Sequence, residues 1–401
     1  MKINEKKQTS SIKQVALIAA LFLGYTMIYI DKLSIGITLV PMAEKYGISA
    51  SEKGFIMSAF FFGYALMQVP MGFLNLKLGS KRIVCFSLFG IAIFASLLSF
   101  GTSVLYFILI RFLAGAIAHS GYAASAAREV QKQIDEKRQT FAQGILLSSS
   151  GIASVLGPKI VTPAVVNLGW SVTYLLLAVL AIVIGVILFF VIPRQTKEEV
   201  KEEKITKESL FQVAKNPVAW VLFFGAFFLN SLMYGAVNWI PSFLTGAKGM
   251  SLTQAGSITS IVGFFFLLGA ILGSFIVGKK FAGNEKNVIS ICASLSAIFL
   301  LLAYFMPTTS LLTMCLGLGD LFCSTTFVTL MSLPLKRFAQ EVFAPSYALV
   351  ATGGILGGVV SPSLIGILVQ ASNGGYFPVF CYFAILGVLS AMVIRRISNK
   401  I

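Results

Sequence analysis

The stretch that decides the fold reads Gly24-Tyr-Thr-Met-Ile-Tyr-Ile-Asp-Lys-Leu-Ser34. It lies inside an apolar run from about residue 15 to residue 40, long enough to cross a bilayer at about 20 residues per helical span. An adjacent acid and base, Asp31 and Lys32, are costly at that depth and are usually retained because they face a water-filled path or a bound ligand. The alternative is a charge pair that reaches outward from a helix end, but the Asp side chain is short for that role.

The composition indicates a membrane protein with many spans. Of the 401 residues, 57% are hydrophobic and 11% are charged, whereas soluble domains carry about 25% charged residues. The N-terminus is polar and basic, and the first apolar run is too long for the core of a cleaved signal peptide. The five cysteines lie in apolar runs without metal-binding spacing, so we expect no disulfide, no metal and no cofactor.

Apolar spans follow one another along the whole chain, with short connections except for one. The twelve approximate ranges are 14–39, 54–75, 82–101, 104–127, 139–165, 171–192, 217–244, 254–278, 287–306, 309–333, 342–370 and 376–394. We therefore predict an all-α membrane protein with two six-helix halves, and we divide the chain at its polar segments. The predicted parts are a cytoplasmic N-tail (1–13), an N-terminal half (14–192), a solvated cytoplasmic linker (193–216), a C-terminal half (217–395) and a cytoplasmic C-tail (396–401).

The basic residues predict the orientation. With the N-terminus inside the cell, 25 of the 31 Lys and Arg residues fall in cytoplasmic segments and three fall in outer loops. Such an asymmetry is the positive-inside pattern of proteins in the cytoplasmic membrane. It also accounts for the net charge of +16 without a nucleic-acid partner, because basic residues at span ends are attracted to anionic lipid of the inner leaflet.

Two segments of the chain repeat one another. Residues 47–58 read Gly-Ile-Ser-Ala-Ser-Glu-Lys-Gly-Phe-Ile-Met-Ser, and residues 249–260 read Gly-Met-Ser-Leu-Thr-Gln-Ala-Gly-Ser-Ile-Thr-Ser. They share the pattern G-x-S-x-[ST]-[EQ]-x-G-x-I-x-S at a constant offset of 202 residues. Both segments open spans of the same orientation, so the two halves form a parallel, pseudosymmetric repeat. This architecture is typical of transporters with a binding site near the midplane, between the halves.

After the second span the chain reads Gly72-Phe-Leu-Asn-Leu-Lys-Leu-Gly-Ser-Lys-Arg82. This segment resembles the signature G-x-L-x-D-[RK]-x-G-x-[RK]-[RK] of the major facilitator superfamily. The glycines and the basic residues match. Leu76 stands at the position of the aspartate through which that family latches its halves together. The resemblance implies the fold of this superfamily.

Within the superfamily the chain most resembles the anion:cation symporters, which carry sugar acids and other organic anions. The passages that carry the resemblance are Tyr29-Ile-Asp31-Lys32, the segment Ser58-Ala-Phe-Phe-Phe-Gly-Tyr64-Ala-Leu-Met-Gln68-Val-Pro-Met-Gly72, Arg111-Phe-Leu-Ala-Gly115, and Asn238-Trp-Ile-Pro-Ser-Phe-Leu244. They are spread over both halves. The resemblance implies transport of a small organic anion with protons.

Several basic residues lie at similar depth in the N-terminal half. Asp31, Lys32, Arg111 and Lys159 all fall within one or two helical turns of the same level, so we expect one cluster with a net charge of +2. A positive cluster in a cavity of low dielectric constant needs an anion, and Arg offers a fork that fits a carboxylate. For Lys159 the alternative is a side chain that reaches outward to the membrane surface. The predicted substrate-binding residues are Tyr29, Lys32, Tyr64, Gln68, Arg111, Lys159, Asn230 and Tyr234.

Three residues are candidates for proton coupling: Asp31, Asp320 and His119. The symporters that the chain resembles carry a glutamate seven residues after the arginine of the fourth span, and Ala118 occupies that position here. Coupling therefore rests on one of the three candidates or is absent. The alternative for Asp320 is a carboxyl bonded to a nearby hydroxyl, and the alternative for His119 is a packing role.

These observations favour secondary uptake of a small organic anion, such as a sugar acid, across the cell membrane together with protons. The expected partners are the anion, protons and the lipid bilayer, and we expect a monomer. An exporter of drugs or metabolites and an uncoupled anion exchanger are the alternatives, together with a sensor that does not transport. An enzyme is not expected, because we find no nucleophile with a matching base, no metal spacing and no nucleotide-binding loop.

Overall fold

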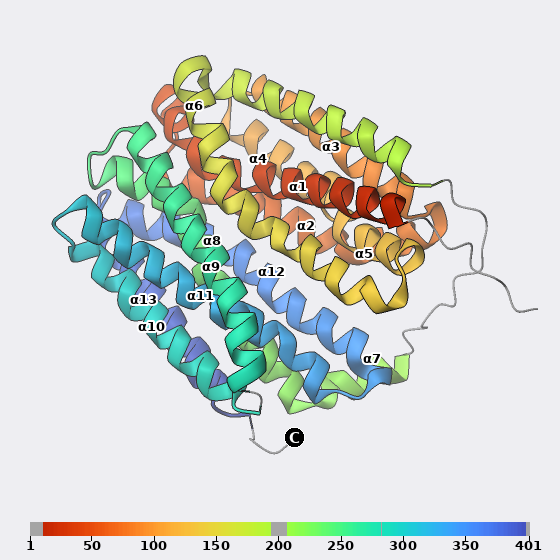
Figure 1. The fold of residues 1–401 in the computed structure, drawn as a ribbon. Coiled ribbons are helices and arrows are strands. Elements are labelled where there is room, and N and C mark those ends of the chain that lie inside the picture. The colour runs from red at the N-terminus through yellow and green to blue at the C-terminus, as the bar shows by residue number, and fades with distance from the viewer. Residues whose placement is uncertain (1–10, 194–206, 282, 398–401) are drawn as a thin grey trace, which may run out of the picture.

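The computed structural model describes residues 11–193, 207–281 and 283–397, and Figure 1 shows them as one bundle of long helices. This part of the chain contains helices and no strands, which confirms the predicted all-α class. The elements are α1 (Ser11–Tyr46), α2 (Ala50–Leu78), α3 (Ser80–Ser99), α4 (Val104–Leu113), the π-helix η1 (Ala114–His119), α5 (Tyr122–Gln133), α6 (Glu136–Val191), α7 (Lys207–Lys215), α8 (Pro217–Gly246), α9 (Leu252–Lys280), α10 (Glu285–Phe305), α11 (Thr309–Arg337), α12 (Gln340–Ala371) and α13 (Phe377–Ile394).

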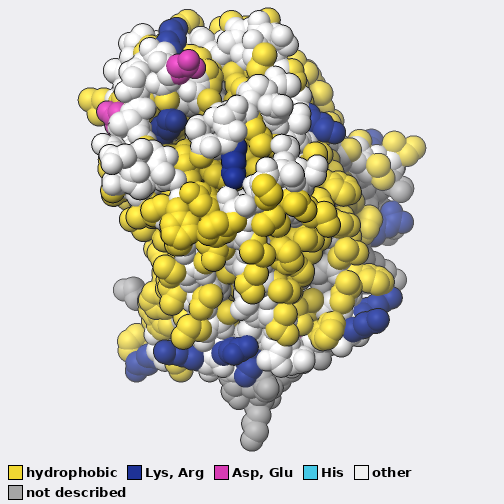
Figure 2. Space-filling model, turned by 90° about the vertical axis from the view of Figure 1, so that its left-hand side faces the viewer, with side chains coloured by type: hydrophobic (Ala, Val, Ile, Leu, Met, Phe, Trp, Pro, Cys, Tyr) yellow, Lys and Arg dark blue, Asp and Glu magenta, His cyan; other side chains and the backbone are white. Residues whose placement is uncertain are grey.

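Eleven stretches of the described chain are long and apolar enough to span a membrane. One of them, residues 141–191 within α6, is too long for a single span, because a span needs about 20 residues. Its backbone leaves helical geometry at Gly169, where φ is 84° and ψ is 160°. The predicted fifth and sixth spans are therefore the two arms of α6, and the fourth span consists of α4, η1 and α5. Figure 2 shows the resulting belt of hydrophobic side chains, with Lys and Arg gathered along its lower edge.

The described part of the predicted linker contains a short helix. Residues 207–215 of this segment form α7, which packs against α12 and α8. Val213 on α7 is buried, so this short amphipathic helix ties part of the linker to the C-terminal half. The predicted N-tail (1–13) and C-tail (396–401) lie mostly outside the described residues, as do positions 194–206 of the linker.

The predicted repeat is visible in the backbone. Glycines with positive φ come in pairs at equivalent places of the two halves: Gly47 and Gly249, Gly79 and Gly283, and Gly169 and Gly374. The same correspondence holds for side chains. The Lys81 ammonium donates to the carbonyl of Ile192 at 2.6 Å, and the Lys286 ammonium donates to the carbonyl of Ile397 at 2.9 Å. Thus the lysine of α3 is bonded to a carbonyl just after the end of α6 in the N-terminal half, and the lysine of α10 is bonded to a carbonyl just after the end of α13 in the C-terminal half.

The matching positions of the repeated segments have matching roles. Ser49 and Ser251 cap the N-termini of α2 and α9, and each forms a reciprocal capping box with the residue three positions later, Glu52 or Gln254. Such boxes satisfy backbone N–H groups that the first turn of a helix leaves unpaired. The pattern therefore encodes two helix starts with the same geometry.

The remaining positions of the pattern bring the two halves together. A Cβ atom added at Gly54 of α2 would lie 2.5 Å from the carbonyl oxygen of Pro362 of α12, and one at Gly256 of α9 would lie 2.1 Å from Thr162 Oγ1 of α6. Only glycine permits approaches this close. We call these two equivalent contacts, Gly54 with Pro362 and Gly256 with Thr162, the twin glycine contacts.

Hydrogen bonds run beside these glycines. The amide of Ser363 donates to Ser58 Oγ at 3.1 Å, and Ser260 Oγ donates to the carbonyl of Val155 at 2.7 Å. All of these groups lie on the side of the bundle remote from α7. In Figure 1 the halves lie against one another on that side and diverge toward α7. The bundle is therefore closed between its halves at one end.

A bulky residue at the first twin contact should open this closed end. In Gly54→Leu the added side chain meets backbone of α12, and overpacking of this kind costs about 1–3 kcal/mol. A cost of about 1.4 kcal/mol shifts an equilibrium between two conformations about tenfold. The positive-inside pattern predicts that the closed end faces outward. A cysteine at Asn238, which is buried, should then react about tenfold faster with a membrane-impermeant maleimide added outside intact cells that lack the native cysteines.

The matched control is Gly72→Leu on the same helix, because an added Cβ there meets nothing within 4 Å. It should leave the rate of labelling unchanged. Equal rates in Gly54→Leu and the control would contradict the assignment of Gly54 to a closing contact.

Candidate functional site

Lys32 lies where the two halves meet. Its ammonium donates a hydrogen bond to the hydroxyl of Tyr234 at 3.1 Å, and these residues are 202 positions apart. One turn further on, Gly36 of α1 packs against the backbone of Asn238 of α8, which is again 202 positions away. Residues at equivalent positions of two repeats can meet only near the axis that relates the repeats. Lys32 therefore sits at the pseudo-twofold axis of the molecule.

Aromatic rings surround the Lys32 ammonium. Its nitrogen lies between 4.3 and 5.8 Å from the centres of four rings. They belong to Tyr29 on α1, Phe61 and Tyr64 on α2, and Tyr234 on α8. We call these four rings the Lys32 cage. Aromatic faces attract a cation without neutralising it. No carboxylate within 4 Å pairs with Lys32 in the described part of the chain, so the positive charge remains available to a ligand.

Asp31, the neighbour of Lys32, points to a different partner. Its carboxylate lies 2.9 Å from Nε2 of His119, and both side chains are buried. Adjacent residues of a helix point about 100° apart, which is why the acid and the base do not pair with one another. His119 is the last residue of η1, and such π-helical segments occur frequently at functional sites. Nδ1 of His119 has no hydrogen-bond partner among the described residues.

Arg111 supports the same turn of α1 from α4. Its Nη2 donates to the carbonyl of Lys32 at 3.3 Å, and its guanidinium lies 4.5 Å from the centre of the Phe60 ring. Phe60 also contacts the His119 ring, at 4.7 Å between centroids. Arg111 is buried, and its Nε has no partner within the described ranges. The Arg111 guanidinium therefore has one unused hydrogen-bond donor, Nε.

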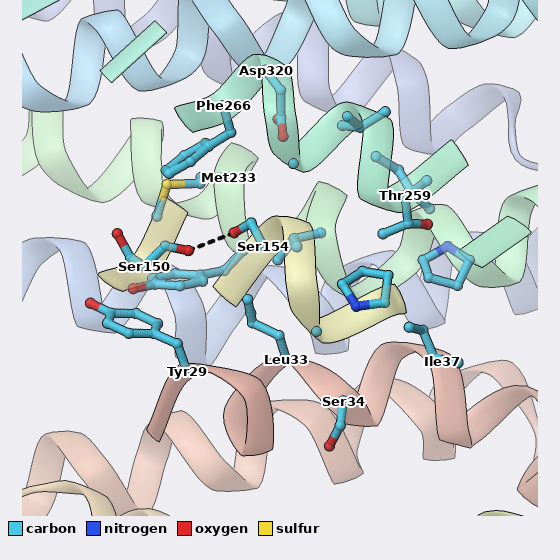
Figure 3. A pocket seen from close by; sticks show the side chains of 18 of the residues that line it. Tyr29, Leu33, Ser34, Ile37, Ser150, Ser154, Met233, Thr259, Phe266 and Asp320 are labelled. Atoms are coloured by element: carbon cyan, nitrogen blue, oxygen red, sulfur yellow. Dashed lines mark hydrogen bonds between the residues drawn. The ribbon is translucent and has the colours of Figure 1, made fainter. Parts of the chain in front are cut away.

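A cavity lies between the halves, and residues of both halves line it. Tyr29 and Tyr234 of the Lys32 cage form part of its wall, and Figure 3 shows Asp320 of α11 directed into it from the other side. Asp320 is 8% exposed. It forms no ion pair with any residue that the structure describes.

Three predicted binding residues do not join this arrangement. Lys159 is exposed and does not line the cavity, because α6 turns Gly157 and Pro158 inward and the next residue outward. Asn230 donates to the carbonyl of Ala226 in its own helix and packs against Gly354 of α12. Gln68 is half-buried and does not belong to the cage. The expected cluster had a net charge of +2. Without Lys159 it consists of Asp31, Lys32 and Arg111 and has a net charge of +1.

Other contributors were not predicted. Phe60 and Phe61 contact the charged groups as described above, and Tyr174 of α6 holds α1 in place through its hydroxyl. That hydroxyl lies 3.0 Å from Thr38 Oγ1 and accepts a bond from Ser34 at 3.4 Å. The chain contains 35 Phe and 12 Tyr residues, mostly in apolar runs, so composition alone does not distinguish these three.

Two repeats of membrane-spanning helices, with a charged cavity at the axis between them, define a transport protein. Comparison with known proteins agrees with this class. The chain belongs to the Major Facilitator Superfamily, because the model of that family matches residues 21–342. It is therefore a multi-pass membrane transporter and not an enzyme.

Curated relatives and solved structures extend the comparison. The chain is 27% identical to a probable sulfoacetate transporter of Cupriavidus necator, over 93% of this chain and 91% of the relative. It is 24% identical to a D-galactonate transporter of Escherichia coli, over 93% and 92%, and 22% identical to a hexuronate transporter of Bacillus subtilis, over 97% and 95%. A bacterial homologue of the human lysosomal transporter Spinster, solved in an inward-facing, unoccupied conformation, shares the fold with a TM-score of 0.78, 16% identity and coverage of 96% and 94%.

The pair formed by Asp31 and His119 should show strong energetic coupling. Asp31→Leu leaves Nε2 of buried His119 unpaired, and such a group costs about 1–3 kcal/mol. The double variant Asp31→Leu/His119→Leu removes both polar groups, so it should be more stable than the sum of the single losses predicts. Unfolding of the detergent-purified variants would measure this cycle. If the loss of stability in the double variant equals the sum of the losses in the two single variants, the two side chains do not interact.

Proposed function

We propose that the protein takes up a small organic anion together with protons across the cell membrane. The observation that carries the proposal is the Lys32 ammonium, which is held at the pseudo-twofold axis by aromatic rings and lacks a carboxylate partner within 4 Å in the described structure. A carboxylate or sulfonate would supply the missing negative charge. The names of the relatives, which refer to sulfoacetate, galactonate and hexuronate, support this class of substrate.

Binding of the anion begins with exchange of a hydrogen bond. The Tyr234 hydroxyl now occupies one donor of Lys32, and an ammonium has three donors. An arriving acid group can bond Lys32 while Tyr29, Tyr64 and Tyr234 offer hydroxyl groups around it. Arg111 holds the carbonyl of Lys32 and has a free donor beside it. Its charge attracts the anion and cannot be lost, because guanidinium does not deprotonate in proteins.

The charges of the site balance when a proton accompanies the anion. Asp31 and Asp320 contribute two negative charges, and Lys32 and Arg111 contribute two positive ones, so the site is neutral when His119 is neutral. A monoanion that enters alone leaves one uncompensated negative charge, which is costly in a medium of low dielectric constant. An anion and a proton together keep the sum at zero. Their binding is then mutually favourable, and this coupling is reciprocal.

The pair of Asp31 and His119 is the proposed proton site. An anion that binds Lys32 and Arg111 competes for the cations that stabilise the Asp31 carboxylate. A proton shared between Asp31 and His119 restores the balance. This pair takes the place of the glutamate that anion:cation symporters carry where this chain has Ala118, since His119 is the next residue of η1.

Alternating access provides the route. The halves contact one another at the end remote from α7. The charge pattern of the sequence supports an orientation with that end outside the cell and both termini in the cytoplasm. The conformation then opens toward the cytoplasm. Rocking of the two halves about the site near Lys32 would expose that site to each side of the membrane in turn. We propose that one chain suffices, because the site lies within it.

Two lysines allow a matched test of anion binding. Lys32→Met should lower the affinity for galactonate, hexuronate and sulfoacetate by about tenfold or more, because loss of one partner of a charged pair costs about 2–5 kcal/mol. Lys159→Met makes the same chemical change at an exposed position and should have no effect. Thermal shift of the purified protein and uptake into proteoliposomes measure both variants. Arg111→Ala should abolish binding and transport. Equal behaviour of the two lysine variants would refute the assignment of Lys32.

Proton coupling has a separate test. Asp31→Asn should abolish accumulation of anion driven by a pH gradient but should preserve exchange of anion between loaded vesicles and medium, because Lys32 and Arg111 remain. His119→Gln should weaken the same coupling. If Asp320→Asn instead abolishes accumulation and Asp31→Asn does not, the proton site lies on α11. If neither substitution changes the pH dependence, the protein is an uncoupled anion exchanger.

A further inference from the structure

We propose that the anion carries an ammonium group at the end remote from its acid group, and that Asp320 binds this ammonium. The substrate class is then an aminocarboxylate or an aminosulfonate. The inference rests on the proposed function, because it assumes that the acid group is bound at Lys32.

The position of Asp320 points to a cationic ligand. Its side chain is more than nine-tenths buried, lines the cavity from the middle of α11 and is directed into it (Figure 3). No Lys, Arg or His pairs with it in the described ranges. Burying an unpaired carboxylate in a membrane protein is costly, and such residues usually face a ligand or an ion path. The cation that the protein does not provide can come from the substrate.

Three hydroxyl groups that line the cavity with Asp320 favour a ligand that only donates hydrogen bonds. Ser150, Ser154 and Thr259 line the same cavity, but their hydroxyl hydrogens are already used within their own helices. They donate to the carbonyls of Leu147 at 3.0 Å, Ser150 at 2.9 Å and Ala255 at 2.8 Å. Their remaining capacity is that of acceptors. Together with the carboxylate, they make the lining of the cavity wall rich in hydrogen-bond acceptors.

An ammonium matches this wall better than a hydroxyl does. It has three donors and no acceptor, whereas a sugar hydroxyl also has lone pairs that seek a donor. Aromatic residues strengthen the match, because Phe266 and Phe327 line the cavity together with Asp320 and aromatic faces attract cations. Tyr29 and Tyr234 line the same cavity, and the Lys32 ammonium lies against these two rings. The proposed ligand directs its acid group past the rings to Lys32 and its ammonium to Asp320.

The ammonium also enters the charge balance of the site. A zwitterion has no net charge, so the sum of charges stays at zero when it binds without a proton, whereas an anion without an ammonium needs one.

The test compares molecules that differ at one group. Binding to the purified full-length protein is measured for 2-aminoethanesulfonate, 2-hydroxyethanesulfonate and 1-propanesulfonate, and for 4-aminobutyrate, 4-hydroxybutyrate and pentanoate. In each set the amine should bind about tenfold tighter than the hydroxyl or methyl analogue, since a close charge pair in a buried site is worth more than about 1.4 kcal/mol. Asp320→Asn should remove this preference without weakening the binding of the hydroxyl analogues.

Glu44→Gln is the matched control, because it removes an exposed carboxylate of α1 that does not line the cavity. It should keep the preference for amines. If Asp320→Asn does not fold, the comparison of amine, hydroxyl and methyl compounds in the wild-type protein still tests the proposal. Amines that bind no tighter than their analogues in the wild type would overturn the proposal. So would an Asp320→Asn variant that weakens amine and hydroxyl compounds alike, which is the behaviour of a proton site.

The two proposals fail in different ways. If galactonate or hexuronate binds and depends on Lys32 while none of the amines binds, the ammonium proposal is wrong and the organic-anion function stands. If no anion of either panel binds to the wild type, the proposed function fails together with the inference.

Discussion

An acid and a base stand side by side in a membrane-spanning helix, and the cost of burying their charges governs the arrangement around them. A helix directs neighbouring side chains about 100° apart, so the two charges are satisfied separately. Asp31 turns into the N-terminal half toward His119. Lys32 turns toward the axis and the C-terminal half. Arg111 meets the backbone of the same turn. One turn of α1 thus connects the internal packing of one half with the surface shared by both.

The surroundings of this turn separate structural from ligand-binding roles. Phe60 lies against both Arg111 and His119, so one ring excludes water from the buried charges. Phe61, the next residue, belongs to the cage around Lys32. The two rings face different environments for the same reason as Asp31 and Lys32 do. On α2, as on α1, one residue faces the interior of the N-terminal half and the next faces the surface between the halves.

Much of this could be predicted where the chemistry of a residue narrows its possible environments. A charge in an apolar run must face protein or water, and for this reason Asp31, Lys32, Arg111, His119 and Asp320 were predicted as site residues. Asp31, Arg111, His119 and Asp320 are buried, and Lys32 lies between the halves. The 202-residue repeat predicted the symmetry. The repeated pattern did not show which of its serines cap helices and which of its glycines pack against the other half. Serine and glycine occur both at helix starts and at helix contacts, so these roles became clear only from the structure.

The remaining errors have a physical cause. Helices in a membrane are apolar toward lipid and apolar toward their neighbours, so periodicity does not show which face is inside. Lys159 is long enough to reach the surface from either face, and Asn230 satisfies itself on its own backbone. The rings of the cage could not be selected among many aromatic residues. The helix α7 was missed because its short apolar face is interrupted by charges.

The twin glycine contacts have a consequence for how the closed end can open. They are related by the pseudo-twofold axis, one on each side of it, and each joins a helix of one half to a helix of the other. A movement that separates only one of them would bend helices against their own half, where packing is dense and resists deformation. Both contacts must therefore part in the same event. The closed end behaves as a single cooperative barrier, which has no half-open form through which ions could leak.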